Sequence, residues 1–175
     1  RYQGIELQRD FSLDLEGTLY ALRKNKPAVL FLAQPNNPSG NLFPAEQVRT
    51  LVKNAPGLVV IDEAYIEYLE NPPDLKPLIR EGKNLICLRT FSKIYGLAGL
   101  RLGYALTTSE VCGAAEKVRS PFNTSSVAQA AGLAALADHD HVVKSREHNS
   151  RELAYLESGL SARGVRFDRA YAQYP

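Results

Sequence analysis

The chain has 175 residues, enough to bury a core of ordinary size, and 45% of them are hydrophobic and 23% charged. A formal net charge of +2 without a basic run argues against a nucleic-acid surface, and no apolar run reaches the roughly 18 residues of a membrane span. Two cysteines are too few for a disulfide framework, so we expect reduced thiols in a cytoplasmic protein.

Helical patterns alternate with short apolar runs. In chain order we expect a helix at about 14–24, a strand at 28–33, a helix at 44–55, strands at 58–62, 85–89 and 102–107, and helices at 125–138 and about 141–163. Val48, Leu51 and Val52 line one face of the second helix. The strands are rich in branched residues and apolar on both faces, as strands buried under helices should be. Gly164 is the expected cap of the last helix.

This alternation predicts an α/β fold with a mainly parallel sheet and helices on both faces. In such sheets ligands gather at the carboxyl ends of the strands. Polar residues follow three of the runs, namely Asn36 and Asn37, then Asp62 and Glu63, then Lys93. The first group lies in QPNNPSGN, which is a turn by composition but places amide side chains where they can bind a cofactor.

The strand LVVID, which ends at Asp62, has two functional interpretations. It is similar to the Mg²⁺-binding strand of a P-loop ATPase, but the phosphate loop G-x-x-x-x-G-K-[ST] that this requires is missing from the sequence. Alternatively, Asp62 is an anion that pairs with a positively charged ring nitrogen. A solvated strand end is the alternative without a function.

Lys93 comes just after the hydroxyl residues Thr90 and Ser92, and Arg101 follows it. An amine becomes nucleophilic where burial and neighbouring cations favour its neutral form, and the arginine fork suits a phosphate. One interpretation is therefore an imine-forming lysine beside a phosphate-bearing aldehyde. The other is a loop lysine with a structural arginine.

The polar stretch that begins Asp138-His139-Asp140-His141 is the remaining cluster of possible metal ligands. Aspartate caps and a solvated face are commoner at a helix start than a zinc site. We therefore predict no metal site.

The motifs PNNPSG, DEAY and TFSKIYGLAGLRLGY, in this order, closely resemble those of fold-type I pyridoxal-phosphate (PLP) aminotransferases. Similarity is closest to the histidinol-phosphate aminotransferases, because KVRSPFNTSSVAQAA also resembles the segment that follows in that family. The lysine motif is the most specific of the three, and the resemblance covers nearly the whole chain.

The resemblance implies that PLP is the cofactor and that Lys93, Asp62 and Tyr65 are the catalytic residues. Lys93 would bind the cofactor covalently and later carry the transferred proton. Asp62 would pair with the ring nitrogen and keep it protonated, the state in which the ring withdraws electrons best.

The remaining cofactor-binding residues follow from the same resemblance. Asn37 and Tyr65 would hydrogen-bond the phenolic oxygen of the ring. Thr90, Ser92 and Arg101 would hold the phosphate.

The family's enzymes are considerably longer than this chain. Residues 1–138 are expected to form the central part of the PLP-binding large domain, and residues 139–175 the linking helix and the first strand of a truncated small domain. The chain lacks methionine, so we expect a piece of a longer protein, cut at both ends.

The implied reaction interconverts histidinol phosphate and imidazole acetol phosphate with 2-oxoglutarate and glutamate. A threonine-phosphate decarboxylase or an aromatic aminotransferase would share the same cofactor residues. From other classes, a P-loop ATPase fragment and an inactive truncated binding domain stay open. The expected partners are small amino-acid and 2-oxo-acid substrates and a second copy in a homodimer, without nucleic acid or membrane.

Overall fold

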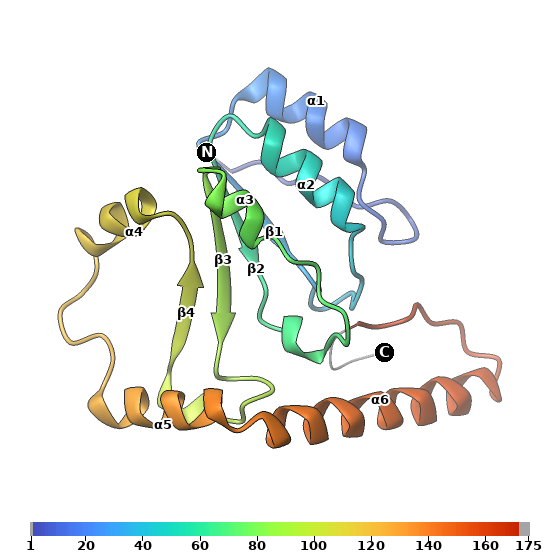
Figure 1. Cartoon of the computed structure of the whole chain (residues 1–175). Helices are drawn as coiled ribbons and strands as arrows, with labels where there is room; N and C mark the ends of the chain where they lie inside the picture. Colours follow the sequence, from blue (N-terminus) through green and yellow to red (C-terminus); the bar gives the residue numbers. More distant parts are fainter. Residues whose placement is uncertain (1, 172–175) are drawn as a thin grey trace.

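A computed structural model describes residues 2–171 and contains a four-stranded sheet in the order β1-β2-β3-β4 (Figure 1). The strands are β1 (Val29–Ala33), β2 (Leu58–Asp62), β3 (Leu85–Thr90) and β4 (Gly103–Leu106). The first three are parallel, and β4 runs antiparallel to β3. The predicted α/β fold with a mainly parallel sheet is therefore confirmed, and each strand lies within a residue or so of its predicted position.

The direction of β4 follows from the short connection that precedes it. A parallel neighbour needs a long crossover, usually through a helix, whereas residues 91–102 contain one short 3₁₀ turn, η2 (Ala98–Leu100). The chain therefore leaves β3 and re-enters the sheet at the same edge, where Phe91 N donates to Leu102 O at 3.1 Å. This connection carries Lys93 and Arg101.

Helices α1 (Leu15–Asn25), α2 (Ala45–Asn54) and α3 (Lys76–Arg80) lie on one face of the sheet (Figure 1). Their apolar side chains form the core with alternate residues of the strands, including Leu22, Leu51, Leu78, Val59, Ile61 and Leu85. Asp14 caps α1, since its carboxylate accepts from Gly17 N at 3.0 Å. The predicted helical spacing in α2 is confirmed, because Val48, Leu51 and Val52 are all buried.

The two faces of the sheet differ in coverage. We predicted helices on both faces, but alternate residues point to the face opposite α1 and α2, and there Phe31 is 74% exposed and Leu88 38% exposed. Helix α5 (Ser126–Ala137) packs beside the sheet, on Phe91 and Leu102 of the β3–β4 connection. Within residues 2–171, the helices thus leave much of the second face open, although its residues are apolar.

The last two helices, α5 and α6 (His139–Ser161), were predicted and lie in line at the edge where β3 ends (Figure 1). Asp138 caps α6 by accepting from His141 N at 3.0 Å, and Gly164 ends the helical segment with a φ of +68°. Helix α4 (Ser109–Glu116), capped by Thr108, was not predicted. It buries none of its residues, so the sequence contains no apolar stripe that would reveal it.

The expected first strand of a small domain is absent from residues 165–171, which are irregular. A strand needs a pairing partner, and here Tyr171 N instead donates to Gly40 O at 2.7 Å. The last four residues of that prediction, 172–175, lie outside the described part of the chain. Among residues 2–171, no helix combines the length and apolarity required to cross a membrane.

Candidate active site

A hollow of about 470 Å³ lies at the edge of the sheet where β2 and β3 end. Its lining consists of Asp62, Ala64, Leu88, Arg89, Thr90, Ser92, Lys93, Ala98 and Arg101. Five of the seven predicted site residues are therefore gathered in one place, because parallel strands deliver their carboxyl ends to the same edge.

Asp62 is the last residue of β2, and its exposed side chain borders the hollow. One carboxylate oxygen accepts from Ala64 N at 3.0 Å, which fixes the turn that leaves the strand. Asp62 shares a sheet face with Thr90, the last residue of β3. The hydroxyl of Thr90 accepts from Ser92 N at 3.1 Å, so the turn after β3 is held in the same manner.

Two buried side chains anchor the loop that carries Lys93. Phe91 is 4% exposed and Ile94 is 3% exposed, whereas Lys93 between them is half-buried. The loop closes through Leu97 N, which donates to Phe91 O at 2.9 Å. Gly96 has a φ of +69°, a conformation that glycine adopts without strain. The lysine is therefore presented by a packed loop rather than by a free surface segment.

The other two predicted residues, Asn37 and Tyr65, do not line the hollow, but Tyr65 contacts Lys93 and Asn37 contacts Tyr65. Lys93 Nζ lies 5.0 Å from the centroid of the Tyr65 ring, a cation–π geometry. Tyr65 is buried, and Asn37 Nδ2 donates to its phenolic oxygen at 2.6 Å. The structure thus links the motifs PNNPSG, DEAY and TFSK into one contact chain.

Arg101 ends the η2 turn with a φ of +52°, which is uncommon for a residue that has a Cβ atom. One of its terminal nitrogens donates to Ala98 O at 2.8 Å, and the side chain is exposed at the hollow. With Arg89 and Lys93 it gives the lining of the hollow three cations, together with the carboxylate of Asp62. Hydroxyls, guanidinium groups and a carboxylate around one hollow suit a ligand that has an anionic and a cationic end.

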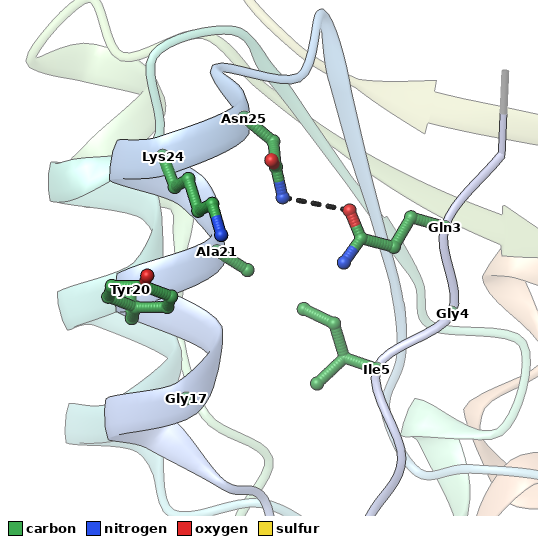
Figure 2. A pocket seen from close by; sticks show the side chains of 8 residues that line it. All are labelled: Gln3, Gly4, Ile5, Gly17, Tyr20, Ala21, Lys24 and Asn25. Carbon is green, nitrogen blue, oxygen red and sulfur yellow. Dashed lines mark hydrogen bonds between the residues drawn. The ribbon is translucent and has the colours of Figure 1, made fainter.

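A second hollow, of about 330 Å³, lies between the N-terminal segment and α1 (Figure 2). Asn25 Nδ2 donates to Gln3 Oε1 across it at 2.8 Å, and Lys24 stands 5.5 Å from the centroid of the Tyr20 ring. It contains none of the predicted site residues and no carboxylate. The chemistry of the chain therefore points to the hollow around Lys93. Among residues 2–171, no group of three or more His, Cys, Asp or Glu residues could hold a metal ion.

Comparison with known proteins gives the family of the chain. The model of the family described as aminotransferase class I and II matches residues 3–170, nearly the whole chain. The chain belongs to the class I and II aminotransferases. This membership also decides against the P-loop ATPase alternative.

Relatives of this aminotransferase chain include histidinol-phosphate aminotransferases from two bacteria. The protein from Akkermansia muciniphila is 40% identical over 94% of the chain, and that from an Anaeromyxobacter species is 47% identical over 89% of the chain. The histidinol-phosphate aminotransferase from Sinorhizobium meliloti, solved in complex with pyridoxal-5'-phosphate, superimposes with a TM-score of 0.89 at 33% identity, covering 98% of this chain and 47% of that one. The chain spans less than half of the two relatives' length, 46% and 43% respectively.

An ion pair between Glu63 and Arg89, which the sequence did not predict, lies next to the hollow. Arg89 Nε donates to Glu63 Oε2 at 2.9 Å, and Glu67 Oε1 lies 3.8 Å from another guanidinium nitrogen. Glu63 is only 2% exposed. The available signal was the alternation of the strands, which puts Glu63 and Arg89 on the core face, each adjacent in sequence to a site residue on the other face.

Burial dominates the electrostatics of this pair. It raises the pKa of the Glu63 carboxyl, and the charge of Arg89 opposes that rise. Burial likewise raises the pKa of Glu67. For Arg89, burial works against the charged form, but the Glu63 carboxylate outweighs it and raises the pKa of the guanidinium above its usual range. The three side chains therefore form an interacting cluster in which Glu63 is buried and Arg89 and Glu67 are partly buried.

Proposed function

We propose that the full-length protein to which this chain belongs is a PLP-dependent histidinol-phosphate aminotransferase of histidine biosynthesis. The observation that carries the proposal is the meeting of Lys93, Asp62 and Arg101 at one hollow. Named relatives at 40–47% identity support the choice of substrate. The reaction would interconvert histidinol phosphate and 2-oxoglutarate with imidazole acetol phosphate and glutamate.

The residues present fit PLP by their chemistry. The cofactor has a phosphate, an aldehyde, a phenolic oxygen and a ring nitrogen that binds a proton, and the hollow presents a guanidinium, an amine and a carboxylate. When bound, PLP supplies an electron sink for the carbanion that forms as a proton leaves the substrate. We assign the binding residues as Asn37, Asp62, Tyr65, Thr90, Ser92, Lys93 and Arg101.

Lys93 has the central part in this assignment. Its amine would hold the cofactor at the aldehyde carbon, and the same amine would take and return the transferred proton. The packed loop between Phe91 and Ile94 limits where Nζ can move, which keeps the base near the reacting carbon.

Asp62 would hold the proton on the ring nitrogen. A carboxylate at a strand end can do this without moving, because its position is fixed by the hydrogen bond from Ala64 N and by the ladder between β2 and β3.

The Tyr65 hydroxyl, with the Asn37 amide bonded to it, would face the phenolic oxygen of the ring. The amide donates to the tyrosine oxygen, so the phenolic hydrogen is free to be donated onward. Tyr65 also contacts Lys93, whose Nζ lies 5.0 Å from the centroid of its ring.

The phosphate end would lie against Thr90, Ser92 and Arg101. The positive φ of Arg101 ends η2, and its guanidinium supplies paired donors that match phosphate oxygens. These three residues hold the cofactor and take no part in proton transfer.

We also propose a homodimer in the cytoplasm. The sparse cysteines support the location, since Cys87 is buried and Cys112 exposed, both as free thiols. The dimer rests on the family alone.

The test uses the full-length protein and three substrates. Histidinol phosphate with 2-oxoglutarate should give glutamate faster than an aromatic amino acid does, and threonine phosphate should release no carbon dioxide. Borohydride reduction of the cofactor-loaded protein should fix the cofactor to Lys93, as identified by peptide mass. Preference for either rival substrate would refute the substrate assignment, and absence of cofactor on Lys93 would refute the whole proposal.

A further inference from the structure

The core face of the sheet carries its own row of polar side chains under the proposed cofactor site. Glu63 follows Asp62 directly, and Arg89 precedes Thr90 directly. Alternation along the strands puts Asp62 and Thr90 on the open face and Glu63 and Arg89 on the core face. Each residue of the pair is thus covalently adjacent to a site residue of the open face, and Arg89 itself also belongs to the lining of the hollow.

The buried pair joins the two strand ends at the last rung of the ladder. Glu63 N donates to Leu88 O at 2.9 Å, and the side chain of Glu63 then accepts from Arg89 Nε at the same distance. Glu63 is 2% exposed, so water does not compete for its carboxylate. A displacement of β2 against β3 at this edge would break the pair and leave a buried charge without its partner, which is strongly unfavourable.

The guanidinium also reaches the segment that carries Tyr65. Its second contact, to Glu67 at 3.8 Å, is with η1 (Ile66–Tyr68), which begins one residue after Tyr65. Arg146 of α6 donates to Glu67 O at 2.9 Å and holds that segment from the other side. Arg89 therefore connects the ends of β2 and β3 with η1, and these three segments carry Asp62, Thr90 and Tyr65.

We propose that Glu63 and Arg89 are positioning residues that set the spacing between Asp62, at the ring-nitrogen end of the bound cofactor, and Thr90, at its phosphate end. This inference rests on the proposed function. Arg89 also belongs to the lining of the hollow, but its guanidinium is held by Glu63 and Glu67, so in this scheme the pair acts by position and not by contact with the cofactor. The planar fork of arginine can meet two carboxylates at once, which the single ammonium of lysine cannot do with the same geometry.

The experiment measures cofactor binding to the full-length apo protein by spectral titration with PLP, for the variants Glu63→Gln, Arg89→Met and both together. Each single variant should raise the dissociation constant of PLP about tenfold or more, since misplaced binding groups are costly. The double variant should bind PLP about as tightly as whichever single variant has the lower affinity, because either change alone already breaks the pair. Arg89→Lys should recover only part of the affinity. The absorption band of the bound cofactor should shift in the single variants.

Val59→Ala is the matched control. Val59 is a buried core-face residue of the same strand β2 but at its opposite end. This variant should lower the melting temperature of the apo protein at least as much as Glu63→Gln does, while the dissociation constant of PLP stays within about twofold of wild type. Comparable weakening by Val59→Ala would show a general loss of stability and overturn the inference.

The outcomes separate the two proposals. Wild-type protein that does not bind PLP refutes the proposed function. If wild-type protein binds PLP and both Glu63→Gln and Arg89→Met bind it equally well, only the positioning role is refuted. The positioning role is also refuted if the losses of PLP affinity in the two single variants add in the double variant. If Arg89→Met does not fold, Glu63→Gln decides, because it keeps the shape of the side chain.

Discussion

The amide of Asn37 donates to the hydroxyl of Tyr65 at 2.6 Å and joins two loops that are 28 residues apart in the chain. The same tyrosine places its ring 5.0 Å from Lys93 Nζ.

Tyr65→Phe keeps the ring and removes the hydroxyl. We expect it to weaken PLP binding about tenfold and to lower the melting temperature by only a few degrees, because one part-buried hydrogen bond contributes about 1 kcal/mol. Spectral titration with PLP measures the change in affinity. Asn37→Ala should cause the same loss of PLP affinity if Asn37 and Tyr65 act together.

Lys93→Ala removes the amine but leaves Phe91 and Ile94 to anchor the loop. Transamination in the full-length protein should be abolished, and borohydride should no longer fix the cofactor to the protein. The far-ultraviolet circular dichroism should match that of wild type, because Lys93 is only half-buried. Lys83→Ala, at the turn before β3, is a control that should keep full turnover. Measurable turnover in Lys93→Ala would contradict the assigned role.

Asp62→Ala leaves the hollow without its carboxylate. A bound ring nitrogen would then lose its proton more readily, so we expect turnover to fall by about a thousandfold or more. Asp62→Asn keeps the shape and the acceptor for Ala64 N, and it should be as slow as Asp62→Ala if charge is what matters. Steady-state rates at saturating substrate distinguish these cases. An Asp62→Asn variant with wild-type turnover would mean that the carboxylate does not act on the ring.

Gly57 lies at the entry to β2, where a Cβ atom would stand 2.3 Å from Ala28 O and 2.6 Å from Pro27 O. Both contacts are with backbone, so no side chain can move aside. Gly57→Ala should therefore lower the free energy of unfolding by about 3 kcal/mol or more. Gly113→Ala, in α4, meets nothing within 4 Å and should raise that free energy by up to about 1 kcal/mol. Urea titration measures both, and equal effects would contradict the packing argument.

Cys87 gives a pH dependence of known sign. Burial, followed by the charge of Glu63, raises the pKa of its thiol to about 12 from an ordinary 9.0. Between these values the unfolded chain holds fewer protons than the folded one, so the free energy of unfolding falls as pH rises, by at most about 1.4 kcal/mol per pH unit. Below pH 9.0 this contribution is fully present.

Cys87→Ala should therefore lose stability less steeply than wild type as the pH rises above 9.0, in urea titrations across the alkaline range. Cys112→Ala is the control, because Cys112 is exposed, and it should retain the wild-type slope. Parallel curves for wild type and Cys87→Ala would show that the buried thiol does not titrate in this range.

Much of the fold could be predicted because its signals are local. Apolar runs bounded by turn residues gave the strands, and the spacing of Val48 and Leu51 gave α2. Helix α4 was missed because it is short and buries no side chain. The sequence could not predict what covers the second face of the sheet, which carries Phe31. Apolar residues on both faces of a strand indicate that both faces are covered, but they do not identify the covering segment.

The candidate site was predictable for a different reason. Parallel strands end at one edge, so Asp62 and Thr90 could be placed together from their positions alone. The pair of Glu63 and Arg89 escaped because its members are 26 residues apart, and pairing between strands is a tertiary property. Neither residue is unusual in its own segment, and only the ladder register brings them into contact.

Because β4 pairs with β3, one continuous segment of the chain supplies most of the lining of the hollow. Thr90, Ser92, Lys93, Ala98 and Arg101 all belong to one uninterrupted stretch whose two ends are fastened by strand pairing. Exchanging that stretch for the equivalent one of another family member would transplant amine and guanidinium as a unit, with their mutual distance intact. Asp62 lies on a separate strand and would come from the recipient protein. Such chimaeras would therefore test whether the partner of the ring nitrogen and the phosphate-binding residues can evolve independently.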